Sequence, residues 1–433
     1  MSVCLESSNK RYAPLALALF DNKKQKGIFV FCCIVIFFLS LWKIYADYQT
    51  YLSNTNYEII AQVKSQYTKI KNQREYFVLR VQDTKGYYFY ITSFLDLKSL
   101  VNREIRIYGK MKQCSFFEFL KSCYFSAYNI ALMPQEGFKA KLQDFIDKQH
   151  QDIRHSMLYR ALFFADSLSK EYRDRVNALG IAHLVAISGF HLGILSALLF
   201  FIFQPIYGFF HKRYFTYRNR IYDLSAMVLF CMFLYLILLD FQASFLRAFV
   251  MSVFGFLLFF GNMRIFSFEM LFVIVGCILA VFPRLVFNVG FVLSVSGVFY
   301  IFLILRHFPK MPWYLWIIAF NSSIFFLMGI IVHFYFPYFS FYQYFSMVLS
   351  VLFVVFFPLM LFLHTIFLGG IFDSFLDLFL IMQFRVIEFY TPWFLLVSYV
   401  LLSFFAIFSK KCFYVLLACS ICFYCYLSYL FLA

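Results

Sequence analysis

Apolar stretches of about 20 residues recur along most of the chain, with short polar segments between them. A helix of that length crosses the hydrocarbon core of a bilayer, which is about 30 Å thick. The first stretch covers residues 28–46, and the others follow residue 180, at 183–209, 221–240, 243–260, 265–282, 287–306, 313–335, 341–366, 391–408 and 412–432. The pattern predicts a mainly α-helical, polytopic membrane bundle of about ten spans.

Two further segments are predicted to be helical without simply crossing the membrane. Residues 134–180 form a charged connector, and its first part has the apolar period of an amphipathic helix at a membrane surface. Residues 371–390 are apolar but contain four charged side chains. Such a helix lies in the interface, re-enters the membrane or lines a cavity.

Between the first stretch and the connector, residues 47–133 change to alternating polar and apolar positions. Residues 76–81 and 87–91, joined by a turn-like Asp-Thr-Lys-Gly, predict a β-hairpin. Strands over 59–70 and 103–111 would complete a small sheet, and we expect an OB-like barrel. A basic, aromatic face on such a barrel can hold single-stranded nucleic acid, although this segment is only mildly basic.

The composition excludes an ordinary soluble protein. Hydrophobic residues make up 63% of the chain and the mean hydropathy is +0.76, whereas soluble domains are roughly 45–50% apolar. The net charge is +16, and many basic residues gather before the first stretch and in one later loop: Lys10, Arg11, Lys23, Lys24, Lys26, Lys212, Arg213, Arg218 and Arg220. By the positive-inside rule both clusters are cytoplasmic, although a basic loop can also contact nucleic acid.

The first stretch is interpreted as a retained membrane helix, because no small-residue cleavage site follows it. With residues 1–27 cytoplasmic, the β domain lies on the periplasmic side of a cell inner membrane. Cys114 and Cys123 are its only cysteines, and an oxidising compartment allows them to form a disulfide. The remaining cysteines lie in or beside apolar stretches, where packing is their expected role, and we expect no metal and no cofactor.

Candidate chemistry begins in the segment 180–193, where His183 and His191 interrupt an apolar stretch and Ser188 and Gly189 lie between them. Ionisable groups at membrane depth normally face a bundle interior or a water-filled path. Glycine costs about 1 kcal/mol relative to alanine in a helix interior, so a break there could expose amide dipoles to a cavity. The two histidines have three interpretations: they hold neighbouring helices together by hydrogen bonds, they line a path, or they bind a metal.

Two later elements also contain functional candidates. Arg247 enters an apolar stretch one turn after Ser244. Its guanidinium could clamp a phosphate, pair with Asp240 seven residues earlier or reach a lipid headgroup. In the other element, Gly290 and Ser294 are small residues suited to close helix packing.

In order and spacing, these three elements resemble the ComEC competence family. Residues 183–191 are similar to its His-Leu-x-Ala-Ile-Ser-Gly-x-His element, residues 244–251 to Ser-x-x-Arg-Ala-x-x-Met, and residues 290–294 to Gly-Phe-x-Leu-Ser. The chain departs from the family at Asn288 and Val292, where an acidic residue and Gln are common.

The resemblance implies an integral membrane protein that carries single-stranded DNA inward during natural transformation. It implies a periplasmic DNA-binding protein and a cytoplasmic helicase or translocase as partners, since no ATP-binding Gly-x-x-x-x-Gly-Lys-Ser/Thr loop is present. Many relatives end in a metallo-β-lactamase-like domain, whose His-x-His-x-Asp-His cluster does not occur here. We therefore expect a channel surrounded by membrane lipid and no enzymatic activity. Whether the channel is a homo-oligomer is left open.

The predicted organisation is a cytoplasmic N-terminus (1–27), a first span (28–46), an OB-like domain (47–133), a connector (134–180) and a channel domain (181–433). The residues expected to line or shape the DNA path are His183, Ser188, Gly189, His191, Ser244, Arg247, Gly290 and Ser294. A secondary transporter of a small solute and a membrane-embedded, histidine-dependent enzyme are the alternatives.

Overall fold

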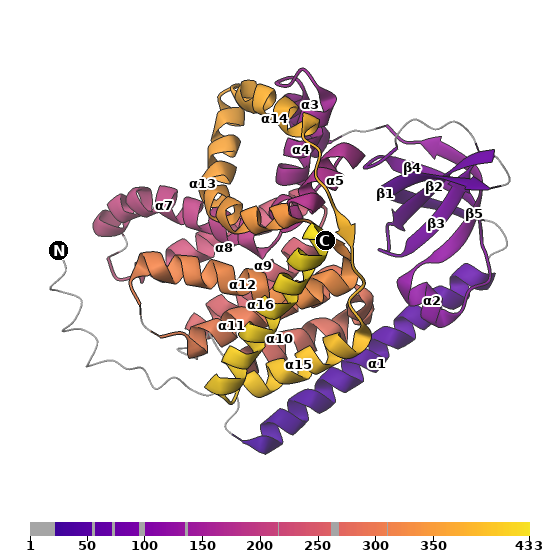
Figure 1. The fold of residues 1–433 in the computed structure, drawn as a ribbon. Coiled ribbons are helices and arrows are strands. Elements are labelled where there is room, and N and C mark those ends of the chain that lie inside the picture. The colour runs from indigo at the N-terminus through magenta and orange to yellow at the C-terminus, as the bar shows by residue number, and fades with distance from the viewer. Residues whose placement is uncertain are drawn as a thin grey trace.

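The computed structural model describes residues 22–53, 57–71, 74–94, 100–134, 137–214, 216–260, 268–309 and 311–433. A large bundle of helices carries a small β-barrel on one side, and the long helix α1 runs along the bundle to the barrel (Figure 1). The basic residues Lys10 and Arg11 lie outside the described part of the chain.

Within the described residues, seven helical segments are long and apolar enough to cross a membrane. They are α1 (Lys23–Ser53), α7 (Gly189–Tyr214), α8 (Arg220–Leu238), α11 (Val289–His307), α12 (Trp313–Tyr335), η2 with α13 (Phe341–Phe345 and Ser346–Thr365) and α16 (Lys410–Leu432). Shorter apolar helices are α9 (Ala243–Phe260), α10 (Phe268–Val281) and α15 (Trp393–Ala406). The predicted helical membrane bundle with a small β domain is confirmed, while the count of ten spans stays a prediction.

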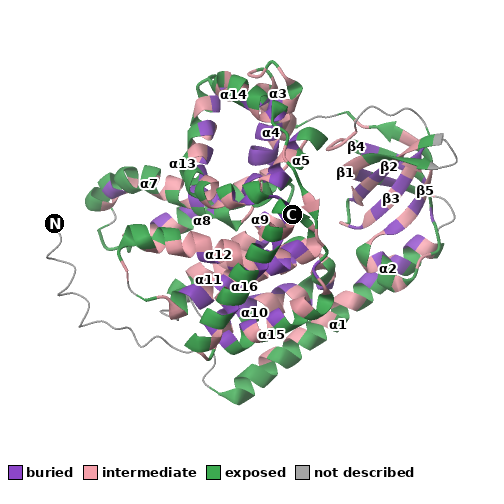
Figure 2. Cartoon of the chain, in the orientation of Figure 1, coloured by how far each residue is buried: buried purple, intermediate pink, exposed green. Residues whose placement is uncertain are grey.

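The outer surface of the bundle is apolar, as a surface facing lipid must be. Large hydrophobic side chains are exposed along α1, including Phe31 at 67% and Trp42 at 75%. Figure 2 shows exposed residues along most of this helix. Because lipid tails are as apolar as leucine, such side chains need no protein cover at membrane depth.

The β domain is a closed barrel of five strands in the order β1-β2-β3-β5-β4. The strands are β1 (Tyr57–Lys71), β2 (Arg74–Asp83), β3 (Tyr88–Ser93), β4 (Glu104–Met111) and β5 (Cys123–Leu132). All pairings are antiparallel except that between β3 and β5. Along β3 and β4 buried and more exposed residues alternate strictly, which explains why the sequence pattern indicated these strands.

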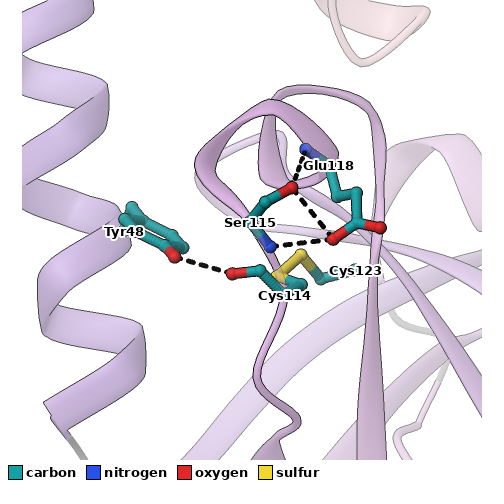
Figure 3. The surroundings of a disulfide bond; sticks show 5 residues. All are labelled: Tyr48, Cys114, Ser115, Glu118 and Cys123. Atoms are coloured by element: carbon teal, nitrogen blue, oxygen red, sulfur yellow. Dashed lines mark hydrogen bonds between the residues drawn. A yellow bond between two sulfur atoms is a disulfide. The ribbon is translucent and has the colours of Figure 1, made fainter.

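Three residues of α1, Ile44, Tyr48 and Tyr51, belong to the barrel core. Tyr48 and Tyr51 are buried there against Phe119 of α2 (Phe116–Lys121), a short helix that the sequence pattern did not predict. Tyr48 donates a hydrogen bond to the Cys114 carbonyl at 2.6 Å, and Cys114 is disulfide-bonded to Cys123 (Figure 3). A disulfide closing so short a loop contributes about 2–3 kcal/mol by restricting the unfolded chain. The membrane helix and the barrel are therefore one continuous structure.

The barrel is also fastened to the rest of the helical part. Arg284, in η1 (Pro283–Phe287), donates hydrogen bonds to the carbonyls of Gly86 (3.1 Å) and Leu120 (3.4 Å). Its guanidinium lies over the ring of Tyr87, 4.4 Å from the centroid. On another side of the barrel, the Ser167 hydroxyl donates to the Lys64 carbonyl at 3.0 Å. These contacts fix the position of the barrel relative to the bundle.

The connector contains three helices, α3 (Phe138–Asp147), α4 (Ile153–Phe164) and α5 (Lys170–Ala178), and the short helix α6 (Ala182–Val185) follows it. Eight of the twelve residues of α4 are buried, so this part of the connector is a core helix. The surface position predicted for the first part of the connector stays a prediction, whereas the apolar side chains of α4 join the largest core cluster of the bundle.

The segment 371–390 contains the end of the 3-10 helix η3 (Gly369–Phe372), one short α-helix, α14 (Asp373–Ile381), and the two-residue strand β7 (Ile387–Glu388). The nine residues of α14 at about 1.5 Å each extend roughly 14 Å, which is too short to cross a bilayer. It lies beside α3 and α4 (Figure 1), where its two aspartates pair with histidines of the connector. A simple crossing by α14 is therefore excluded, and the three alternatives given for this segment stay open.

Candidate functional site

The helix expected over 183–209 is interrupted near its beginning. The short helix α6 ends at Val185 and α7 begins at Gly189, with residues 186–188 non-helical between them. The Ser188 hydroxyl accepts the Phe190 N–H at 3.3 Å, and the Ser188 carbonyl accepts the Leu192 N–H at 3.2 Å. Ser188 thus satisfies backbone donors at the start of α7, which a free helix end would leave unpaired.

The break packs against α9. The Ser244 hydroxyl donates a hydrogen bond to the Ile187 carbonyl, which has no helical partner of its own. A Cβ atom at Gly189 would lie 3.2 Å from Ala248 Cβ, which is tighter than ordinary van der Waals contact. Gly189 therefore allows the first turn of α7 to approach α9 closely.

Arg247 joins α9 to α11. Its side chain is buried, at 5% exposure, and its Nη2 donates to the Gly290 carbonyl at 2.9 Å. The guanidinium also lies 5.7 Å from the ring centroid of Phe291. A Cβ atom at Gly290 would lie 3.6 Å from Arg247 Nη2, which is an ordinary van der Waals contact. Ser294 follows one turn later on α11 and is half-buried.

The alternative pairing of Arg247 with Asp240 is wrong. Asp240 accepts a hydrogen bond from Lys139 at 2.6 Å instead, which ties the end of α8 to the connector. Among the residues that the structure describes, Nε of Arg247 is buried without a hydrogen-bond partner. The guanidinium therefore has donors to spare, because one carbonyl occupies one of its five N–H groups.

The two histidines of the motif lie in different surroundings. His183 is exposed; its Nδ1 donates to the Gly180 carbonyl at 3.0 Å, and its Nε2 lies 3.3 Å from Ser350 Oγ on α13. His191 is fully buried at 0% exposure, with its ring edge-on to Phe353 and Phe357. His183 therefore holds neighbouring segments together by hydrogen bonds. Neither ring nitrogen of His191 has a hydrogen-bond partner within the described chain.

The predicted elements thus meet in one place, which we name the α7–α9–α11 junction and define by Ser188, Gly189, Ser244, Arg247 and Gly290. Contacts from Ser244 and Gly189 join α9 to the break, and the Arg247 hydrogen bond joins α9 to α11. His183 instead faces α13. The junction combines a buried cation with a helix break inside an apolar bundle.

Sequence reasoning missed a second polar group, outside the junction. His150 pairs with Asp373 at 2.8 Å, and His155 pairs with Asp377 at 2.9 Å. The only signal was the charge in the segment 371–390, because the partners are more than 220 residues apart. Nothing in the local sequence indicates which histidines would meet these aspartates.

These features define a multi-spanning helical membrane protein with an attached five-stranded barrel and a buried arginine among its apolar helices. Residues 162–432 match the family model named Competence, described as competence protein. The match covers more than half of the chain, so the chain belongs to the competence protein family. No curated protein and no solved structure matches the chain significantly.

The close approach at Gly189 predicts opposite effects of one substitution at two glycines of α7. Gly189→Ala should lower stability by about 1 kcal/mol or more, because its methyl group overpacks Ala248. Gly193→Ala should raise stability by about 0.5–1 kcal/mol, because a Cβ there meets nothing within 4 Å and alanine is the better helix former. Thermal unfolding of the purified variants measures both, and a stabilising Gly189→Ala would contradict the packing described.

The unpartnered ring of His191 predicts that a similarly sized apolar residue is tolerated in the fold. A buried polar group without a hydrogen bond costs about 1–3 kcal/mol, so His191→Leu should leave the unfolding temperature unchanged or raise it. Unfolding of the variant at a clearly lower temperature would show that the imidazole has a partner in the protein. His183→Leu, which loses the contacts to Gly180 and Ser350, is the matched comparison and should destabilise.

Proposed function

We propose that this competence protein passes single-stranded DNA across the cell inner membrane into the cytoplasm. The observation that carries the proposal is the α7–α9–α11 junction, where a buried guanidinium keeps unused donors beside a helix break. A polyanion crossing apolar surroundings needs fixed positive charge and N–H donors, and a guanidinium can hold phosphate oxygens through two parallel hydrogen bonds. Membership of the competence family supports DNA as the polyanion.

The barrel would receive the strand before it enters the bundle. Its five strands in the order β1-β2-β3-β5-β4 fit an OB-like barrel, a fold whose surface commonly holds single-stranded nucleic acid. The rings of Tyr108 and Tyr128 are exposed and lie 6.3 Å apart, and Lys112 lies over the ring of Tyr124. Stacking of a base on such a ring contributes about 1–3 kcal/mol.

A cleft of about 1040 Å³ lies beside this face, between the end of α1 and strands β4 and β5. Lys110, Lys112, Tyr48 and Tyr128 are among its lining residues, together with Glu118. Basic and aromatic side chains around an open cleft suit a nucleic-acid backbone and its bases. In this proposal the barrel is periplasmic, residues 1–27 are cytoplasmic, and a periplasmic DNA-binding protein delivers the strand. A cytoplasmic helicase or translocase pulls it inward.

Uptake of labelled donor DNA in a deletion strain tests the proposal. The strain should bind DNA outside but contain no label protected from nuclease in its cytoplasm, and a plasmid copy of the protein should restore entry. Normal cytoplasmic entry of the label in the deletion strain would refute passage through this protein. That result would favour a small-solute transporter or a histidine-dependent enzyme instead.

Substitutions of Arg247 separate its charge from its hydrogen bond to Gly290. Arg247→Gln keeps a neutral donor and should reduce transformation about 10-fold or more, because a charge-assisted contact to phosphate is lost. Arg247→Lys keeps the charge and should retain more transformation than Arg247→Gln. Arg306→Gln, an equal loss of charge at the exposed end of α11, should have no effect. Equal transformation by the Gln and Lys variants at equal protein level would assign Arg247 a structural role only.

A further inference from the structure

We propose that Asp152, His155 and Asp377 form a binding site for a divalent transition-metal ion, which joins the connector to α14. Asp152 is the N-cap of α4, His155 lies in the first turn of that helix, and Asp377 lies in α14. One ligand atom from each residue lies within 4.8 Å of the other two. The site is separate from the α7–α9–α11 junction, and it does not depend on the proposed passage of DNA.

The histidine has the surroundings of a metal ligand. The imidazole of His155 is buried at 1% exposure, its Nε2 lies 2.9 Å from Asp377 Oδ1, and its Nδ1 lies 2.6 Å from the Tyr172 hydroxyl. Metal-binding histidines almost always have such a partner on the other ring nitrogen, because it fixes the ring orientation and the tautomer.

The Tyr172 hydroxyl suits both states of the site, because a phenol can donate or accept a hydrogen bond. Without metal, His155 Nε2–H donates to Asp377 and Nδ1 accepts from Tyr172. With metal, Nδ1–H donates to the Tyr172 oxygen and Nε2 offers its lone pair to the ion. Binding therefore needs a change of tautomer that keeps the hydrogen bond between Nδ1 and Tyr172, while the hydrogen bond from Nε2–H to Asp377 is replaced by bonds of both residues to the ion.

Asp152 supplies a carboxylate whose orientation is fixed. Its Oδ1 accepts a hydrogen bond from the Arg154 backbone N–H at 2.7 Å. Arg154 orients the carboxylate through Nε at 2.8 Å and Nη2 at 2.6 Å, both to Oδ2. Each carboxylate oxygen has two lone pairs, so an oriented carboxylate can still bind a metal. Because the guanidinium offsets one of the two carboxylate charges, the ligand set keeps a net negative charge for a divalent cation.

The ligand types indicate the class of metal. Imidazole nitrogen is favoured by first-row transition ions, and carboxylate oxygens are shared by zinc and manganese sites, whereas magnesium and calcium prefer oxygen ligands alone. Three protein ligands leave positions for water, and the Asp377 side chain is 59% exposed, so solvent reaches the site. Zn²⁺ and Mn²⁺ are therefore the ions to test.

The protein contains a matched control for this site. His150 and Asp373 form a second histidine–aspartate pair between the connector and α14, at 2.8 Å. The two nitrogens of His150 face different neighbours, Asp373 and His364, so one atom cannot converge with both. In the described residues, this pair belongs to no group of three convergent ligands.

The experiment measures metal binding to the full-length protein, purified in detergent and stripped with a chelator. After equilibration with ZnCl₂ or MnCl₂ and removal of free ion, elemental analysis should find one saturable equivalent in the wild type. Asp152→Asn and Asp377→Asn should weaken binding at least about 10-fold, in line with the loss of a metal ligand or its support. Asp373→Asn should bind as the wild type does.

Loss of metal binding in Asp152→Asn would not be caused by misfolding, because asparagine is as good an N-cap as aspartate. Each variant should elute as the wild type does, and added Zn²⁺ should raise the unfolding temperature of the wild type and Asp373→Asn only. The proposal is overturned if the wild type lacks a saturable equivalent, or if Asp152→Asn and Asp377→Asn bind with unchanged affinity. Loss of binding in Asp373→Asn as well would assign the metal to another site.

Discussion

The hydrogen bond from Arg247 to the Gly290 carbonyl holds a cation inside an otherwise apolar group of helices. A guanidinium at membrane depth is costly unless protein groups or water surround it. Here the ring of Phe291 lies 5.7 Å away, and the helix break contacts α9 at Ser244, one turn before Arg247. α9 thus contacts the break before α7 through Ser244 and contacts α11 through Arg247, so a single helix joins the three elements within an apolar bundle.

The barrel can contribute to such a path only if it keeps one position. Its core includes Tyr48 and Tyr51 from α1, and the Arg284 guanidinium closes over Tyr87 from the bundle side. The disulfide between Cys114 and Cys123 keeps α2 beside the end of α1 (Figure 3). A strand bound on the barrel would therefore meet the bundle at a constant place, and no hinge between the two parts is needed.

The sequence predicted most of what depends on local patterns. Apolar length indicated the long helices, strict alternation indicated β3 and β4, and the Ser188-Gly189 pair indicated the break before α7. Short elements such as α2 were not predicted, because six residues in a disulfide-closed loop are too few to show a helical period. The α14 helix was recognised as unusual because of its charges, but its length was not evident.

Choices between distant partners could not be made from the sequence. Asp240 was as reasonable a partner for Arg247 as any group, and only the packing of α9 on α11 selects the Gly290 carbonyl. The pairing of His155 with Asp377 joins residues 222 positions apart, so it depends on the complete fold. The same holds for His191, whose lack of a partner within the described chain becomes visible only when its neighbours are in place.

Photochemical crosslinking during uptake tests the central claim most directly. A photoreactive amino acid would replace Ser294, one turn from Gly290 on α11, and in a second strain Leu305, which is 46% exposed on the same helix. With labelled donor DNA stalled during entry, the account predicts a covalent DNA adduct at position 294 and none at 305. Equal labelling at both positions, or labelling of the barrel without any at 294, would contradict a DNA path through the α7–α9–α11 junction.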